Sequence, residues 1–161
     1  MNFIMLAGRA RVGKTTLARW ISEFAFRNGM HPYLLSFAGT LKKEAKKLGY
    51  SKKKDAVAYR KFCQELSLAK KTEDPDFWVR KMHEEVENIR VKEKQLLQED
   101  QKFWEATIIV DDCRFMNEVA YGRICGATQI FVSSGKRKLE DENALWRLDS
   151  SEHMANCIEL G

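Results

Sequence analysis

The sequence predicts an α/β fold of three layers, with a parallel sheet between two layers of helices. Short apolar segments alternate along the chain with longer segments of helical spacing, an order typical of parallel sheets. A loop with two glycines separates the first apolar segment from the first helical one. At 161 residues the chain is most simply one domain that can bury its own core. Because parallel sheets of this kind bind ligands at the carboxyl ends of their strands, we expect the functional site there.

The glycine-containing loop, Gly8-Arg9-Ala10-Arg11-Val12-Gly13-Lys14-Thr15, has the spacing of a phosphate-binding P-loop. Side chains at the two glycines would block backbone amides that turn inward around a phosphate. Lys14 would neutralise charge on the β- and γ-phosphates, and Thr15 would offer a hydroxyl to Mg²⁺. Thr15 also opens a helix, whose N-terminal dipole favours an anion. Arg9 and Arg11 either touch phosphate or point to solvent.

Both flanks of the loop have the expected character. The almost wholly apolar residues 2–7 predict a buried strand, and residues 16–28 predict a helix that ends at Gly29. The residues expected on the inward face of this helix are Leu17, Ile21, Phe24 and Ala25. After a turn at His31-Pro32, residues 33–37 predict a second buried strand, and Thr40 is the expected cap of a helix that reaches residue 48.

Two further helices are predicted before the next strand. Asp55 can cap a helix over residues 56–71, in which Arg60 and Gln64 share one face. The residues that this helix would turn toward a core are Val57, Phe62, Leu66 and Ala69. A longer helix over about residues 76–101 carries an apolar stripe of Trp78, Met82, Val86, Ile89 and Leu96. A simple crossover needs less helix than this, so we expect residues 38–102 to form a helical insertion that caps the sheet edge.

The last predicted strands bring acidic and basic residues to the same edge. Residues 106–110 predict a buried strand that ends in Asp111-Asp112, and adjacent strand residues point to opposite faces, so only one of these carboxylates can serve a metal directly. A helix over residues 117–124 and a strand over residues 128–132 follow. Residues 133–150, which contain Lys136, Arg137 and Arg147, fit either a mobile lid or an ordinary charged surface loop.

The net charge and the cysteine spacing exclude few classes of protein. The net charge of +5 suits an anionic ligand, and the lysines between residues 42 and 54 form either a solvated helix face or a surface that attracts nucleotides. The cysteines, Cys63, Cys113, Cys125 and Cys157, form no Cys-x-x-Cys pair, which favours reduced thiols over a zinc site or disulfides. We expect a cytoplasmic protein without a leader or a membrane-spanning segment, and no stable nucleic-acid partner.

The stretch Asp112-Cys113-Arg114-Phe115-Met116-Asn117-Glu118 resembles the deoxynucleoside monophosphate kinases of bacteriophages, within the wider nucleoside monophosphate kinase group. Other segments agree in the right order: Lys14-Thr15-Thr16, Ser36-Phe37-Ala38 with Leu41-Lys42, Arg60 with Gln64, Pro75-Asp76-x-Trp78-Val79, and Ser151-Glu152. The sequence departs from the family at Glu65-Leu66-Ser67, where a glycine is expected after the leucine, and in the short stretch after Glu152.

The resemblance implies ATP-dependent phosphorylation of a deoxynucleoside monophosphate with Mg²⁺. It implies catalytic roles for Lys14, Asp112 and Arg114. ATP would be bound by Gly8, Arg11, Gly13, Lys14, Thr15, Thr16 and Arg137. Thr15 and Asp112 would hold the metal, with Asp111 as the alternate that a bare strand-end argument would choose first. The acceptor would be bound by Phe37, Lys42, Arg60, Gln64, Trp78, Arg114, Asn117, Glu118 and Glu152, although Phe37 and Trp78 also fit core positions. A homodimer is compatible with this interpretation.

Three alternatives remain open. Another small-molecule P-loop kinase, similar to dephospho-coenzyme A kinase, would use the same loop for a different acceptor. A P-loop ATPase switch that acts on DNA would need a nucleic-acid surface, and only the lysines between residues 42 and 54 support one. A P-loop fold that has lost catalysis is disfavoured by the intact Lys14, Thr15 and Asp112.

Overall fold

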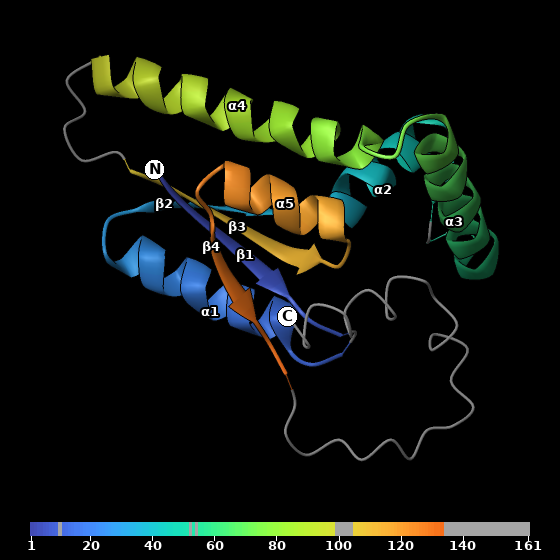
Figure 1. Cartoon of the computed structure of the whole chain (residues 1–161), viewed down its shortest axis with the longest axis horizontal. Coiled ribbons are helices and arrows are strands. Elements are labelled where there is room, and N and C mark those ends of the chain that lie inside the picture. The colour runs from blue at the N-terminus through green and yellow to red at the C-terminus, as the bar shows by residue number, and fades with distance from the viewer. Residues whose placement is uncertain (10, 52, 54, 99–104, 134–161) are drawn as a thin grey trace.

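The computed structural model of the chain describes every residue except 10, 52, 54, 99–104 and 134–161. It is an α/β fold in which a four-stranded parallel sheet is flanked by helices (Figure 1). The strands are β1 (Asn2–Ala7), β2 (His31–Leu35), β3 (Ala106–Cys113) and β4 (Thr128–Phe131). The helices are α1 (Lys14–Arg27), α2 (Phe37–Lys47), α3 (Ala56–Glu73), α4 (Phe77–Gln98) and α5 (Met116–Ile124). The alternation predicted from the sequence is confirmed.

The strands lie in the order β2-β3-β1-β4, so β1 and β3 are central. Ile108, Ile109 and Val110 of β3 are fully buried, as expected for a strand covered on both faces. The expectation of a second buried strand was wrong, because β2 lies at an edge of the sheet and Leu34 is 51% exposed. The strand also begins at His31, two residues earlier than predicted.

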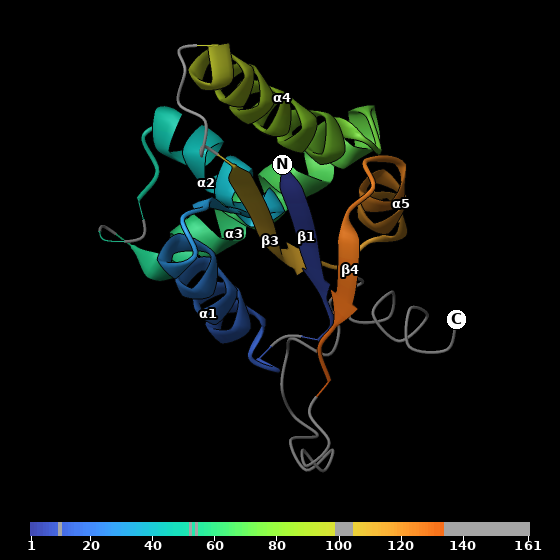
Figure 2. The ribbon, with the colours of Figure 1, turned by 90° about the vertical axis from the view of Figure 1, so that its left-hand side faces the viewer.

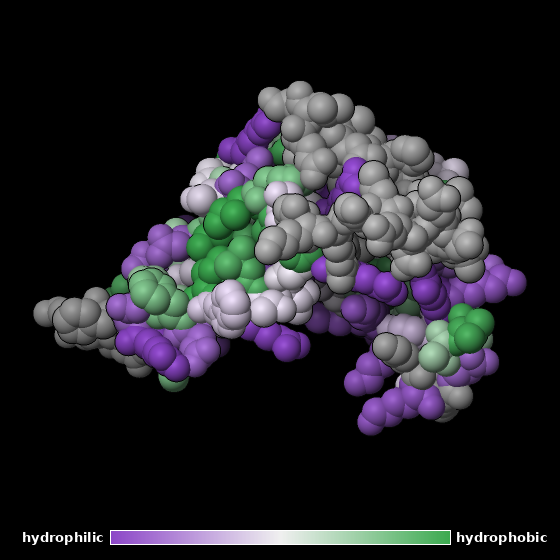
Figure 3. Space-filling view, turned by 90° about the horizontal axis from the view of Figure 1, so that it is seen from below, coloured by the Kyte–Doolittle hydropathy of each residue, from purple (hydrophilic) through white to green (hydrophobic). Residues whose placement is uncertain are grey.

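Helices cover the two faces of the sheet unequally. Helix α1 lies on one face, while α4 and α5 lie on the other (Figures 1 and 2). Ala18 and Ala25 of α1 are buried, but Phe24, which we expected to face inward, is 66% exposed. The small alanines allow the helix to approach the sheet, and Phe24 falls on its flank. Apolar side chains are therefore visible on the molecular surface when it is viewed from the α1 side (Figure 3).

Helix α4 provides most of the core on the opposite face. Its predicted stripe is confirmed, with Trp78, Met82, Val86 and Ile89 all buried. The same stripe continues with the buried Glu93, which a pattern of apolar residues does not reveal. Its carboxylate accepts a hydrogen bond of 3.0 Å from the backbone N–H of Ala106 at the start of β3. A polar residue in the core is thus explained by a backbone donor that requires a partner.

Helices α2 and α3 join β2 to α4 near the carboxyl ends of the strands (Figure 1). Ser36, not Thr40, caps α2, since the Ser36 hydroxyl accepts a bond of 2.8 Å from the Gly39 N–H and Thr40 is buried inside the helix. Asp55 caps α3 as predicted, with bonds of 2.9 and 3.0 Å from Val57 and Ala58 N–H. None of the residues of α3 is buried, so the predicted inward placement of Val57 and Ala69 was wrong.

Several predictions fall outside the described residues. These are the lid at 133–150 apart from Ser133, together with Lys136, Arg137, Arg147, Glu152 and Cys157. Within the described part, Cys63, Cys113 and Cys125 are free thiols, in agreement with the cysteine spacing. Among the helices of that part, none combines the length and the apolarity that a membrane crossing would need.

Candidate functional site

In the loop between β1 and α1, both glycines have the positive φ angles that favour glycine. We expected glycine there because side chains would block the amides, whereas at Gly8 the structure shows a close approach of another strand end. Gly8 has φ +132°, and a Cβ there would lie 2.3 Å from the carbonyl oxygen of Val132. Val132 N–H also donates to the Ala7 carbonyl over 2.9 Å, so the loop starts directly against the end of β4. Gly13 has φ +100° with open space where a Cβ would lie, and Arg11 has φ 63°. The loop therefore needs glycine for close approach at one position and for conformation at the other.

Lys14 is enclosed by the loop that precedes it. Its side chain is buried, and Nζ donates to the carbonyl oxygens of Gly8 at 2.6 Å and Arg9 at 2.5 Å. An ammonium group that bonds to these carbonyls lies in the curve of the loop, where a phosphate would meet the amides of the same segment. Arg11, Gly13, Thr15 and Thr16 are exposed around it. The structure thus gathers the described residues predicted to bind ATP at one place.

Thr15 meets an acidic residue from the neighbouring central strand. Its hydroxyl donates to Asp111 Oδ2 over 2.7 Å, which joins the start of α1 to the end of β3. A hydroxyl and a carboxylate at this spacing are the oxygen donors that Mg²⁺ prefers beside a nucleotide. Among the described residues, there is no group of three or more His, Cys, Asp or Glu side chains that could hold a metal ion. The donor set fits a metal that is shared with phosphate oxygens.

Asp112 faces the other side of the strand. Its two carboxylate oxygens accept bonds of 2.8 Å each from the backbone N–H groups of Phe37 and Ala38, at the first turn of α2. Burial raises the pKa of Asp112, and these two amide bonds oppose that shift. The structure therefore brings Asp111 to Thr15 and uses Asp112 to anchor α2. The two aspartates point in opposite directions, as strand alternation predicted. Asp111, which was the alternate candidate for the metal, is the one that lies beside Thr15.

The segment that follows β3 is held by Glu118. Its carboxylate, buried at the start of α5, accepts bonds of 2.7 Å from Arg114 N–H and 3.0 Å from Phe115 N–H. Burial raises the pKa of Glu118 to about 7, opposed by the two amide bonds and by the charge of Lys71. Arg114 is half-buried, and its positive charge lowers the pKa of Asp112.

Asn117 also makes contacts within the protein. Its side-chain amide donates to the Pro75 carbonyl oxygen at 3.0 Å and to Asp76 Oδ1 at 2.9 Å. These bonds tie the start of α5 to the turn before α4. The structure therefore uses Asn117 and Glu118, both predicted to bind the acceptor, to fix the surroundings of Arg114.

The other predicted acceptor residues divide into two groups. Phe37 and Trp78 are each 5% exposed and belong to the main core cluster, so the structure places them at the core positions that were the alternative interpretation. Lys42, Arg60 and Gln64 are exposed on α2 and α3. Within the described part, these three are the exposed members of the predicted acceptor set, whereas the side chain of Arg114 is half-buried.

Sequence reasoning missed Lys71, which lies beside the Arg114 segment. Its Nζ is 3.2 Å from the centroid of the Phe115 ring, a cation–π contact. Lys71 follows Gln64 by seven residues and Arg60 by eleven, so the three share one face of α3. That spacing was the signal that could have found it.

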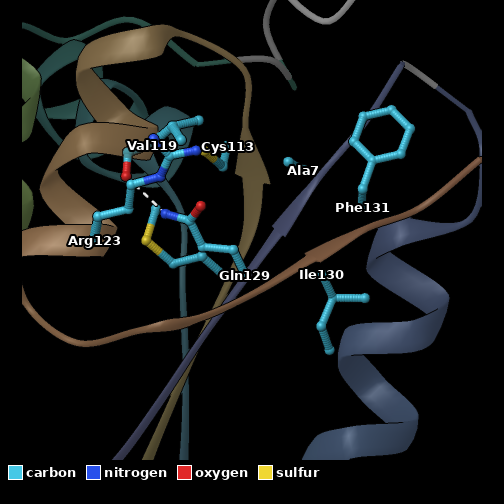
Figure 4. Close-up of a pocket in the computed structure, with 8 residues that line it drawn as sticks. Ala7, Cys113, Val119, Arg123, Gln129, Ile130 and Phe131 are labelled. Atoms are coloured by element: carbon cyan, nitrogen blue, oxygen red, sulfur yellow. Dashed lines mark hydrogen bonds between the residues drawn. The ribbon is translucent and has the colours of Figure 1, made fainter. Parts of the chain in front are cut away.

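A pocket of about 200 Å³ lies between α5 and the strands β1 and β4, and Ala7, which directly precedes the loop, is part of its lining (Figure 4). Its lining is formed by Met5, Ala7, Cys113, Val119, Arg123, Gln129, Ile130 and Phe131. The Gln129 amide donates to the Val119 carbonyl over 2.7 Å, and a Cβ at Gly122 would lie 2.4 Å from Met5 Sδ. Burial raises the pKa of the Cys113 thiol, which keeps it protonated. These contacts describe close packing of α5 on the sheet.

Comparisons of the chain with protein-family models, with curated proteins and with solved structures gave no match. What the structure shows is an α/β protein with a four-stranded parallel sheet flanked by helices, with the glycine-containing loop at the carboxyl edge of that sheet. The resemblance to the deoxynucleoside monophosphate kinases therefore depends on the sequence motifs described above, chiefly residues 112–118.

Proposed function

We propose that this protein is a P-loop kinase that transfers the γ-phosphoryl group of ATP to a deoxynucleoside monophosphate. The observation that carries the proposal is the juxtaposition of the buried Lys14, the Thr15–Asp111 contact and the Arg114 segment at one edge of the sheet. The acceptor class is supported by the resemblance of residues 112–118 to the bacteriophage enzymes. In this interpretation α2, α3 and α4 form the acceptor-binding insertion of the fold.

The loop would bind the phosphates of ATP. Its amides and the Lys14 ammonium offer donors and positive charge to the β- and γ-phosphates, and phosphoryl transfer depends mainly on such positioning and charge neutralisation. Thr15 and Asp111 would hold Mg²⁺, which supplies further neutralisation of phosphate charge when bound. The structure favours Asp111 over Asp112 for this role, because both oxygens of Asp112 already accept bonds from α2.

The acceptor would lie between Arg114 and α3. A guanidinium binds a phosphate through two parallel bonds, which suits both the acceptor phosphate and the transferred group. Arg60 and Gln64, exposed on α3, would contact the acceptor from the cap. Asp112 serves this arrangement by anchoring the first turn of α2, and Glu118 serves it by holding the backbone of Arg114.

Two competing functions, a kinase with another acceptor and a DNA-dependent switch, are supported by different features of the chain. A kinase with another acceptor, such as dephospho-coenzyme A, would use the same loop, so only a substrate comparison separates it. A DNA-dependent switch depends on the basic run after residue 42. In the structure Lys43 pairs with Glu85 at 2.7 Å and Lys47 with Glu44 at 2.8 Å, which reduces the positive charge available to nucleic acid.

The test is an ADP-release assay with ATP and Mg²⁺ across deoxynucleoside and ribonucleoside monophosphates, with dephospho-coenzyme A and DNA as further arms. We expect turnover with at least one deoxynucleoside monophosphate. Lys14→Met should abolish it while filling nearly the same buried volume, and Lys43→Met, which removes an exposed lysine of α2 that pairs with Glu85, should not. Turnover only with dephospho-coenzyme A or DNA, or an active Lys14→Met variant, would overturn the proposal.

A pair of variants separates the two aspartates. Asp111→Asn should raise the Mg²⁺ concentration needed for half-maximal turnover, because it removes the charge beside Thr15. Asp112→Asn should instead raise the KM for the acceptor, because it weakens the anchor of α2. If the two variants exchange these effects, the metal role belongs to Asp112.

A further inference from the structure

Helix α3 contacts the segment that follows β3 through the side chain of Lys71. Lys71 stands near its C-terminal end, half-buried, with Nζ 3.2 Å from the centroid of the Phe115 ring. The neighbouring Lys70 takes a different direction, because it pairs with Glu73 at 2.8 Å and lies 5.6 Å from the Phe77 ring centroid. Of two adjacent lysines, only Lys71 is directed to the segment that carries Arg114.

The same segment is held from the other side by α5. Glu118 accepts from the backbone N–H groups of both Arg114 and Phe115, and the charge of Lys71 acts on the Glu118 carboxyl group. The Phe115 ring is thus covered by a cation from α3, while its backbone is bound by a carboxylate from α5. Lys71 and Glu118 together enclose the residue that follows Arg114.

This contact is one of a small set that holds α3, together with the stacking of Phe62 on Tyr50 at 3.6 Å between ring centroids. None of its residues, 56 to 73, is buried, whereas α4 buries five. A cation on an aromatic face is worth a small but measurable free energy, and it restricts both partners. The contact therefore links α3 directly to the Arg114 segment.

We propose that Lys71 is a positioning residue for Arg114, which acts through the Phe115 ring and couples α3 to the segment between β3 and α5. The inference rests on the proposed function, because it assigns Arg114 to the transferred or acceptor phosphate. Arg60, Gln64 and Lys71 lie along one face of α3, so an acceptor that binds Arg60 and Gln64 also fixes the helix that orients Arg114.

The first experiment measures kinetics. Lys71→Met should lower kcat about tenfold with little change in the KM for ATP, Lys71→Arg should restore most of the rate, and Lys70→Met should behave like the wild type. Phe115→Leu should lose a similar factor, and the double variant Lys71→Met/Phe115→Leu should lose no more than either single variant. Additive losses, or equal effects of Lys70→Met and Lys71→Met, would overturn the inference.

A second experiment decides the inference even if the reaction is different. Hydrogen exchange of the Arg114 and Phe115 amides reports how firmly Glu118 and Lys71 hold the segment. We expect faster exchange at both amides in Lys71→Met and none of this change in Lys70→Met. Unchanged exchange in Lys71→Met would refute the positioning role, whereas an inactive wild type with the expected exchange pattern would refute only the proposed function.

Discussion

The consecutive helices α3 and α4 resemble each other in length and charge but differ in how they are held. Helix α4 buries Trp78, Met82, Val86, Ile89 and Glu93 against the sheet, while α3 buries none of its residues and lies beyond the carboxyl ends of the strands (Figure 1). The difference shows that an apolar spacing along a helix does not by itself create a core contact. Two of the residues proposed to contact the acceptor, Arg60 and Gln64, lie on α3, the helix without buried residues.

The strongest way to test the comparison is to remove core volume from each helix. Met82→Ala should lower the free energy of unfolding by about 3 kcal/mol, because Met82 is fully buried and its loss leaves a cavity. Val57→Ala on α3, where the side chain is 80% exposed, should change it by less than about 0.5 kcal/mol. Urea unfolding with both variants gives the contrast directly. Equal losses would show that α3 is packed as firmly as α4.

The carboxyl group that holds the Arg114 segment should make the protein sensitive to pH. Burial raises the pKa of Glu118 from 4.5 to about 7, so the folded protein binds this proton more tightly than the unfolded chain. The contribution of this proton to the free energy of unfolding is fully present below pH 4.5 and is lost as the pH rises through 7. The change amounts to at most about 3 kcal/mol.

Glu118→Gln isolates this effect, because it keeps an oxygen for the Arg114 and Phe115 N–H groups and removes the titration. The free energy of unfolding of the wild type minus that of Glu118→Gln should fall between pH 4.5 and pH 7. Denaturant unfolding at several pH values measures that difference. A difference that stays constant or rises with pH would mean that Glu118 is well stabilised as an anion.

The smallest expected effect concerns the two helix caps. Ser36→Ala removes the cap of α2, a helix with buried residues, so a loss of about 1 kcal/mol should appear in global unfolding. Asp55→Ala removes the cap of α3 and should mainly speed amide exchange in its first turn, with little change in the global transition. A global loss from Asp55→Ala that equals the loss from Ser36→Ala would erase the distinction between the helices.

The order of strands and helices could be predicted from the sequence because periodicity reports local structure. Partners in space were harder to predict. The apolar residues of β2 gave no sign that it would be an edge strand, because pairing with β3 depends on the chain path between them. Likewise Val57 has the spacing of an inward residue, but no element of the core covers it. Thr40 was predicted to cap α2 and Ser36 was assigned to the preceding strand, but the strand ends at Leu35 and Ser36 caps the helix.

The candidate site followed a similar pattern. The loop motif predicted a turn that leads into a helix, and the structure shows that turn with Lys14 buried inside it and the Thr15 hydroxyl bonded to Asp111. Strand alternation predicted that Asp111 and Asp112 diverge, but which of them meets Thr15 depends on where α1 and α2 lie. Glu118 and Asn117 were expected at the acceptor, while the structure shows their side chains bonded to the chain itself. Hydrogen-bond partners of this kind are not encoded in a residue pattern.

The close approach of Gly8 to the Val132 carbonyl oxygen has a practical use. It means that the chain leaves β4 beside Gly8, the first residue of the loop proposed to bind ATP. Ser133 is exposed directly after this contact, so a fluorophore attached there would sit next to the loop. The proposed binding of ATP could then be tested optically from a single labelled position at the end of the sheet.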